Sequence, residues 1–222
     1  NAPPPGPLPL TDLLGDPPLG AQLANIDEAK WMHAEANASA DSPNKALGVM
    51  AHPTESLAQR FHEMLATAQS NVVVISPYFI PGDEGMERIR MGREHGVNIT
   101  VITNSLADSD EPLVNINYNR YRVDMLKLGV NLYEVSTQQL RRSGQFRDLL
   151  KKARGRLHAK LALVDRQWVL LGSMNLDPRS ARLNTEFGVR VRSFDLTQAL
   201  LFAYQLDDIE GVYRVTLKPD GQ

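Results

Sequence analysis

The 222-residue chain contains no cysteine, and it lacks any apolar run of the roughly 20 residues that a membrane-spanning helix needs. The first absence excludes disulfide bonds and thiolate metal sites. The second predicts that the chain does not itself cross a bilayer. Neither sign of charge dominates, since 24 Lys and Arg residues stand against 26 Asp and Glu residues. This balance argues against a protein that coats nucleic acid through bulk charge.

Two further features are missing from the sequence. The chain begins at Asn1, without methionine and without the basic-then-apolar segment of a secretion signal. We therefore expect a processed protein or a piece of a longer one. The five histidines show no spacing typical of metal ligands. We expect no metal and no cofactor.

Seven of the 14 prolines fall within the first eighteen residues. Such a stretch supplies few backbone donors for a sheet or a helix interior, so it predicts extended, linker-like backbone. We expect residues 1–46 to be a proline-rich linker followed by an irregular segment, with a short helix around Ala29–Ala38. The folded domain is predicted to span residues 47–222.

Within that domain, segments of helical and strand-like periodicity alternate. We expect strands at 71–76, 97–103, 131–135, 157–164, 168–171 and 186–191, and helices at 53–68, 85–94, 117–128 and 196–209. The β-α-β-α-β order of the first part implies parallel strands with right-handed crossovers. The prediction is one α/β domain with a mixed, mostly parallel sheet flanked by helices on both faces.

The most informative segment of the chain runs from Leu157 to Asp165. It contains an H-x-K-x-x-x-x-D pattern on a predicted strand, in which His158 and Lys160 share one face. An imidazole beside an ammonium group, with the small polar residues Ser173 and Asn175 following, is suited to binding a phosphate.

This motif, together with Gly172-Ser173-x-Asn175 and the run from Asp177 to Glu186, resembles the phospholipase D superfamily. The likeness extends from about Asn71 to Val191 and is closest to the C-terminal half of bacterial cardiolipin synthases of the C-type branch. Members of the superfamily carry two such motifs, from two halves of one chain or from two identical subunits. This chain has one, and we favour a missing N-terminal half over a homodimer.

The resemblance implies a reaction and a role for each motif residue. One histidine attacks phosphorus to form a phosphohistidine, and the other protonates the departing alcohol. His158 would be one of the two, and Lys160 would hold a phosphoryl oxygen. Ser173 and Asn175 would donate hydrogen bonds. Glu186 would accept a hydrogen bond from a motif histidine and so select its tautomer.

Two residues of the motif are interpreted as structural: Asp165, at a predicted turn, and Gly172. Every motif position also has a simpler explanation, because a single histidine on a strand is most often a core residue and a Gly-Ser pair is most often a turn. The simultaneous match to one template favours the functional interpretation.

A basic segment directly precedes the motif. It holds seven cations and one acid, Asp148. We predict that it contacts anionic lipid headgroups through Arg141, Arg142, Lys151, Lys152 and Arg154. Contact with a nucleic-acid backbone and a solvated surface without a partner are alternatives. Tyr78 follows a predicted strand, where it would contact substrate or pack in the core.

The sequence therefore predicts a phosphatidyltransferase of the cardiolipin synthase type, peripherally associated with a bacterial membrane. Its expected partners are phospholipids, the membrane surface, and an N-terminal catalytic half or a second copy of the chain; nucleic acid is not expected. One alternative is a phosphodiesterase that hydrolyses phospholipid or nucleic acid. Another is an inactive isolated half that acts as a structural module.

Overall fold

A computed structural model of the chain describes residues 32–48, 56–106, 112–142, 157–203 and 209–218. The chain divides into two compact units, Asn1–His33 and Ala34–Gln222. The helices and strands within the described ranges all belong to the second unit. The predicted proline-rich linker lies outside the described residues.

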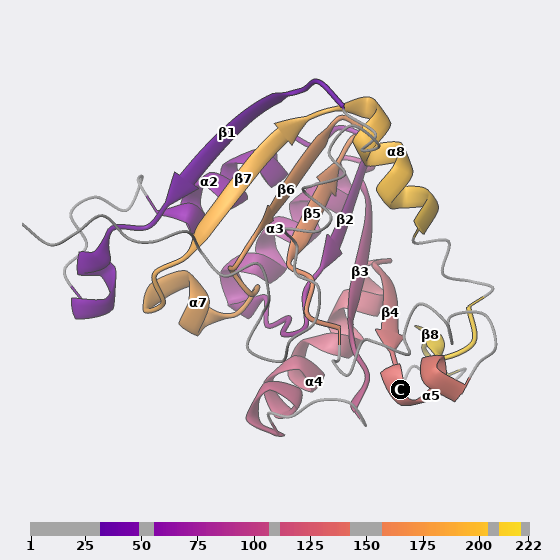
Figure 1. The fold of residues 1–222 in the computed structure, drawn as a ribbon. Coiled ribbons are helices and arrows are strands. Elements are labelled where there is room, and N and C mark those ends of the chain that lie inside the picture. The colour runs from indigo at the N-terminus through magenta and orange to yellow at the C-terminus, as the bar shows by residue number, and fades with distance from the viewer. Residues whose placement is uncertain (1–31, 49–55, 107–111, 143–156, 204–208, 219–222) are drawn as a thin grey trace, which may run out of the picture. The chain divides into compact units, whose positions relative to one another are not determined.

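The described strands form one mixed sheet in the order β1-β7-β6-β5-β2-β3-β4-β8 (Figure 1). Their bounds are β1 (Glu35–Ala40), β2 (Asn71–Ile75), β3 (Asn98–Asn104), β4 (Asn131–Val135), β5 (Leu161–Val164), β6 (Trp168–Gly172), β7 (Phe187–Arg192) and β8 (Val212–Val215). The predicted α/β class and mixed sheet are confirmed. The expectation of a mostly parallel sheet is wrong, because only the pairs β2–β3 and β3–β4 are parallel.

The strand directions follow from the connections. A helix links β2 to β3 and another links β3 to β4, which allows parallel pairing. By contrast, β5 and β6 are joined by a tight turn at 165–167 and pair antiparallel, and β7 extends the same antiparallel sheet.

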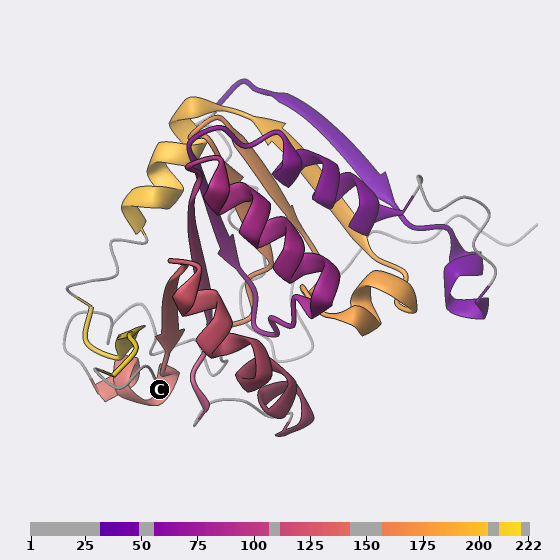
Figure 2. The same cartoon turned by 180° about the vertical axis from the view of Figure 1, so that it is seen from behind.

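Helices cover the sheet on both sides. Figure 2 shows α2 (Leu57–Ala66), α3 (Gly82–Glu94) and α4 (Pro112–Lys127) in front of the strands. On the other side, α8 (Phe194–Ala203) lies next to β6 (Figure 1). Three short elements complete the described fold: η2 (Pro43–Leu47, a 3₁₀ helix), α5 (Thr137–Arg142) and α7 (Pro178–Arg182).

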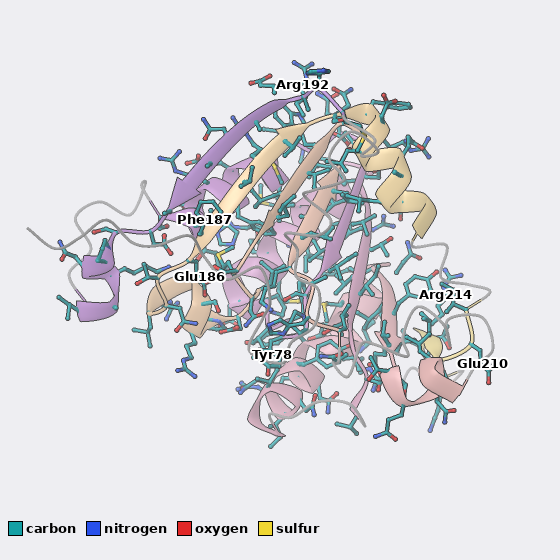
Figure 3. The ribbon with its side chains drawn as sticks, in the orientation of Figure 1. Tyr78, Glu186, Phe187, Arg192, Glu210 and Arg214 are labelled. Atoms are coloured by element: carbon teal, nitrogen blue, oxygen red, sulfur yellow. The ribbon has the colours of Figure 1, made fainter. Side chains whose placement is uncertain are left out.

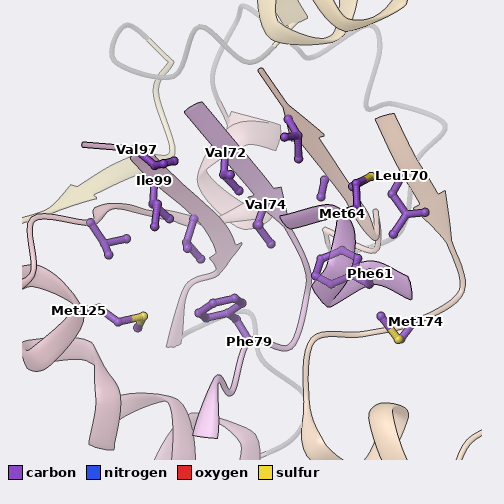
Figure 4. Packing of buried hydrophobic residues seen from close by; sticks show 14 of the residues in the cluster. Phe61, Met64, Val72, Val74, Phe79, Val97, Ile99, Met125, Leu170 and Met174 are labelled. Atoms are coloured by element: carbon purple, nitrogen blue, oxygen red, sulfur yellow. The ribbon is translucent and has the colours of Figure 1, made fainter. Parts of the chain in front are cut away.

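Buried apolar side chains form two clusters, one on each face of the sheet. The larger cluster lies under α2, α3 and α4 and includes Val72 and Val74 of β2 (Figure 4). Ile75 and Ile102 belong to the smaller cluster on the opposite face. Successive side chains of a strand point to opposite faces, so β2 is buried on both sides, as its β-branched sequence predicts.

The N-terminal boundary of the fold differs from the prediction. Residues 35–40 form β1, an edge strand paired antiparallel with β7. The expected helix around Ala29–Ala38 is therefore wrong in its described part, and the folded unit starts at Ala34 rather than near residue 47. The alanine-rich segment has a local preference for helix, but pairing with a strand about 150 residues away overrides that preference.

Candidate active site at one end of the sheet

The strand register brings distant parts of the motif to one end of the sheet. Leu161, the first residue of β5, is paired with Ile75 at the end of β2 and with Leu171 near the end of β6. Gly172 of β6 is in turn paired with Gly188 near the start of β7. The predicted catalytic residues adjoin these positions and so lie at the same end: His158, Lys160, Ser173, Asn175 and Glu186.

The prediction that His158 and Lys160 lie on a strand is wrong. They belong to the extended segment that precedes β5. The Gly172 backbone amide donates to the Lys160 carbonyl (3.1 Å), which keeps this segment beside the end of β6. The His158 side chain is exposed. The segment is also held from the other side, because Asn104 Nδ2 donates to the Leu157 carbonyl (3.2 Å).

Glu186 is the buried anion of the site. Its side chain is 6% exposed and accepts a hydrogen bond from the Ser173 hydroxyl. Ser173 Oγ also accepts from the Phe187 backbone amide (3.0 Å), so the hydroxyl is fixed from both sides. This arrangement joins the loop after β6 to the start of β7.

Lys160 is the partly buried cation of the site. Its Nζ donates to the His158 carbonyl at 2.9 Å. Burial lowers the pKa of Lys160, and the negative charge of Glu186 opposes that shift without cancelling it. The described hydrogen bond of Lys160 is to a neutral carbonyl group, so its positive charge remains available to a phosphoryl oxygen.

Asn104 and Asn175 each hold a buried Oδ1 atom that has no hydrogen-bond partner within the described residues. Buried acceptors without a partner are uncommon in folded proteins. Asn104 is the last residue of β3, and Asn175 lies three residues after the end of β6. Their carbonyl oxygens are available to accept from a substrate hydroxyl or from water.

Gly172 permits the close approach of β6 and β7. A Cβ atom at this position would lie 2.2 Å from the Phe187 carbonyl oxygen and 2.8 Å from Gly188 Cα. Any side chain would therefore push the two strands apart at the point where Ser173 meets Glu186. This close approach is consistent with the structural role assigned to Gly172.

Asp165 stands at the far end of β5, in the turn to β6, with a φ of 52°. Its carboxylate accepts from the backbone amides of Gln69, Ser70 and Asn71 and from the Ser70 hydroxyl, at 2.8–3.0 Å. Burial acts to raise the pKa of this carboxyl, but these hydrogen bonds together outweigh burial and lower it. The contacts suit a structural residue, because they tie the β5–β6 turn to the segment before β2.

Tyr78 lies in a loop that is bound to the motif. The buried Ser76 hydroxyl donates to the Tyr78 carbonyl (2.7 Å) and accepts from the Leu176 amide (3.2 Å). The Ile80 amide donates to the Leu176 carbonyl (2.7 Å). The half-buried Tyr78 is thereby placed at the site end of the sheet (Figure 3).

A buried ion pair behind Glu186 was not anticipated from the sequence. Asp41 accepts from Lys45 Nζ and from the Glu186 amide (3.1 Å), and its own amide donates to the Glu186 carbonyl (2.8 Å). Lys45 also donates to the Ser180 carbonyl (3.0 Å). An acid and a base at i, i+4 spacing are common on protein surfaces, so the sequence gives no reason to predict that this pair is buried.

Comparison with known proteins identifies the family of this chain. Residues 61–203 match the family described as "Cardiolipin synthase, PLD-like domain". The chain belongs to this family. It is 35% identical over 161 residues to cardiolipin synthase C of Escherichia coli (strain K12), covering 72% of this chain and 34% of that protein. The chain thus spans about a third of the length of this relative.

Solved structures share the fold at low sequence identity. The phospholipase D family member Nuc from Salmonella typhimurium matches with a TM-score of 0.56 and 16% identity, covering 83% of this chain and 99% of that chain. Phosphatidylserine synthase from Haemophilus influenzae Rd KW20 matches with a TM-score of 0.58 and 15% identity, covering 82% and 40%. The predicted phospholipase D-like fold is confirmed, as is the predicted relation to cardiolipin synthases of the C type.

The structure describes only some of the residues that bear on membrane contact and metal binding. No helix within the described ranges is long and apolar enough to span a membrane, and no group of three or more potential metal ligands occurs there. Arg141 and Arg142 are the last two residues of α5. The remaining predicted lipid contacts, Lys151, Lys152 and Arg154, lie outside the described residues.

Proposed function

We propose that the chain forms one half of the active site of a phosphatidyltransferase, which transfers a phosphatidyl group from one phospholipid to a hydroxyl group of another. The observation that carries the proposal is the meeting of His158, Lys160 and the Ser173–Glu186 pair at one end of the sheet. In a member of the cardiolipin synthase family, this arrangement is suited to a phosphodiester.

The proposed reaction proceeds in two steps. One histidine attacks phosphorus, and the bond from phosphorus to the leaving alcohol breaks as the second histidine donates a proton to that oxygen. In the second step, the acceptor hydroxyl gives its proton to the second histidine and attacks phosphorus, which releases the first histidine. His158 takes one of these roles, and its exposed side chain can meet a histidine from outside the chain.

The remaining residues hold charge and orientation. Lys160 stabilises the negative charge on the non-bridging oxygens, which repels nucleophiles in a free phosphodiester. The carboxylate of Glu186, held by Ser173, accepts a hydrogen bond from a motif histidine and selects the tautomer that leaves the other nitrogen free to react. The Asp41–Lys45 pair positions the Glu186 backbone.

The second histidine comes from an N-terminal catalytic half or from a second copy of the chain. The length comparison supports the first source, because the matched cardiolipin synthase is about three times as long as the matched region. The enzyme would act as a peripheral protein on a bacterial membrane, with the basic residues before the motif near anionic headgroups.

The test is an assay with three substrates. The complete gene product is incubated separately with phosphatidylglycerol, phosphatidylethanolamine and a labelled single-stranded oligonucleotide. Formation of cardiolipin supports the proposal. Release of phosphatidic acid without transfer indicates a hydrolase, and cleavage of the oligonucleotide without lipid turnover contradicts the lipid assignment. A monomer that turns over none of the three is an isolated structural half.

A further inference from the structure

A large cavity lies on the helix side of the sheet, and its lining does not include His158, Lys160, Ser173 or Glu186. It has a volume of about 660 Å³ and lies between α2, α3 and the strands β2 and β3, with one end at α7. This volume falls within the range of pockets that hold small molecules. Of the predicted catalytic residues, Asn175 alone lines this space.

The buried residues that line the cavity are all apolar. Its buried lining includes Phe61, Val72, Val74, Phe79, Ile99 and Met174 (Figure 4). The charged residues that line it are exposed or half-buried, so they lie at its rim. Buried apolar side chains with charged groups at the rim favour a hydrocarbon chain attached to a charged group over a wholly polar ligand.

Two positively charged side chains of the rim are close to one acidic partner. Arg88 forms an ion pair with Glu84 (2.6 Å), and Arg182 acts electrostatically on the same carboxylate. The Arg88 Nε atom is buried and has no hydrogen-bond partner within the described residues. The rim therefore has capacity to bind an anionic or carbonyl oxygen.

The cavity lies close to the proposed phosphate site. A small void of about 20 Å³ is lined by Lys160 together with Phe61, Met174 and Leu176. These three apolar side chains also line the large cavity. One layer of side chains thus separates Lys160 from the cavity, and it includes an unbranched methionine, which adapts easily to a new neighbour. Asn175, next along the chain, lines the cavity as well.

We propose that this cavity binds one acyl chain of the phospholipid whose phosphate lies at His158 and Lys160. The inference rests on the proposed function, because it takes its phosphate site from there. It adds a site that selects a diacyl lipid by its tail, whereas the motif residues contact the phosphodiester alone. Lipids that share a headgroup and differ in chain length should then differ in affinity.

The expected difference in affinity follows from the free energy of burying methylene groups. Each methylene moved from water into an apolar site contributes about fourfold in affinity. Dioctanoylphosphatidylglycerol has two more methylenes per chain than the dihexanoyl lipid. With one chain in the cavity, the longer lipid should bind on the order of tenfold more tightly.

The experiment measures binding to the 222-residue chain by NMR with labelled methyl groups. The ligands are dihexanoyl- and dioctanoylphosphatidylglycerol below their micelle concentrations, and glycerophosphoglycerol as a headgroup without chains. We expect the dioctanoyl lipid to shift the methyl signals of Val74, Ile99 and Met174. The signals of Ile102 and Val135, which lie on the other face of the sheet, should stay in place.

A matched pair of variants separates the cavity from general binding. Leu65 lines the cavity on α2, and Leu65→Trp would fill part of it. Leu47 is 77% exposed and lies outside the cavity lining, so Leu47→Trp is the control. Leu65→Trp should abolish the gain from the longer chains, and Leu47→Trp should keep it. The unfolding midpoint of each variant shows whether it is folded.

The results can overturn this inference independently of the proposed function. Equal affinity for the two lipids, methyl shifts confined to residues outside the cavity, or no lipid binding would each contradict an acyl site. His158→Ala should leave the chain-length dependence intact, because it alters only the phosphate site. Acyl binding in a protein without transferase activity would thus contradict the proposed function and uphold the cavity.

Discussion

The Ser173 hydroxyl donates a hydrogen bond to the buried carboxylate of Glu186, thirteen residues later in the chain. The same hydroxyl accepts from the amide that follows Glu186. Ser173 directly follows β6. Among the described hydrogen bonds, its hydroxyl is the only side-chain group that donates to this carboxylate. The carboxylate in turn acts on the charge of Lys160.

Glu186→Gln should move the pH dependence of activity. Glu186 raises the pKa of Lys160 against the larger, opposite effect of burial. Loss of its charge would lower the Lys160 pKa further, so the ammonium group would be lost at a lower pH. The alkaline limb of the kcat/KM profile should shift to lower pH, and the exposed Glu35→Gln should leave it unchanged. An alkaline limb that stays in place would argue against the coupling.

Asp165→Asn should remove a pH-dependent part of the stability. The Asp165 pKa is lowered in the fold, so its carboxylate stabilises the fold above the ordinary value of 3.8, and this contribution is lost as the pH falls through the folded-state pKa. The variant should lose about 1–2 kcal/mol at neutral pH in urea unfolding. The difference from the parent protein should shrink in acid.

The choice of asparagine and a control variant make the test of Asp165 specific. Asn is suited to the positive φ at this position, so the substitution tests the hydrogen bonds and the charge rather than backbone strain. Asp124→Asn, an exposed change on α4, is the control and should lie within about 0.5 kcal/mol of the parent. A constant difference across the pH range would contradict the role of the Asp165 charge.

Lys45→Met should destabilise the fold strongly. The Lys45 and Asp41 side chains are 3% and 1% exposed, and removal of the cation leaves a buried, unpaired carboxylate. The expected cost is about 3–5 kcal/mol. Changing both residues, as Asp41→Asn with Lys45→Met, should cost less than the sum of the single changes. Lys127→Met is the exposed control, and equal effects at the two lysines would refute the buried pair.

Gly172→Ala should destabilise the fold, whereas Gly92→Ala should not. The new Cβ at Gly172 would meet the Phe187 backbone at 2.2 Å, which neither strand can relieve without moving. We expect a loss of about 1–3 kcal/mol in thermal unfolding and a larger relative loss of activity. At Gly92, inside α3, the nearest atom is the Ile99 side chain at 3.3 Å, and the change should be neutral or stabilising. Similar effects of both changes would show that the β6–β7 contact is loose.

The sequence identified the parts of the fold that depend on local pattern. The strand Asn131–Val135 has the predicted bounds, and the buried β2 follows from its β-branched run. The site residues were found because their spacing matches a family template. Their meeting at one sheet end then follows from the β5–β6 turn and the pairing of β2 with β5.

The remaining features depend on contacts between distant segments. β1 has a helix-favouring composition and is a strand only because β7 pairs with it. The Asp41–Lys45 pair is buried because Glu186 and Ser180, both far along the chain, enclose it. Likewise, the cavity arises from the packing of α2 and α3 over the sheet, which no local pattern specifies.

In the proposed reaction, His158 reacts directly with the phosphodiester. The most direct measurement compares His158→Ala with His33→Ala, an exposed histidine that is not part of the cavity lining, in the complete gene product. Conversion of phosphatidylglycerol to cardiolipin should fall by at least about a thousandfold in the first variant, and it should be unchanged in the second. Transfer that persists in His158→Ala would contradict the account.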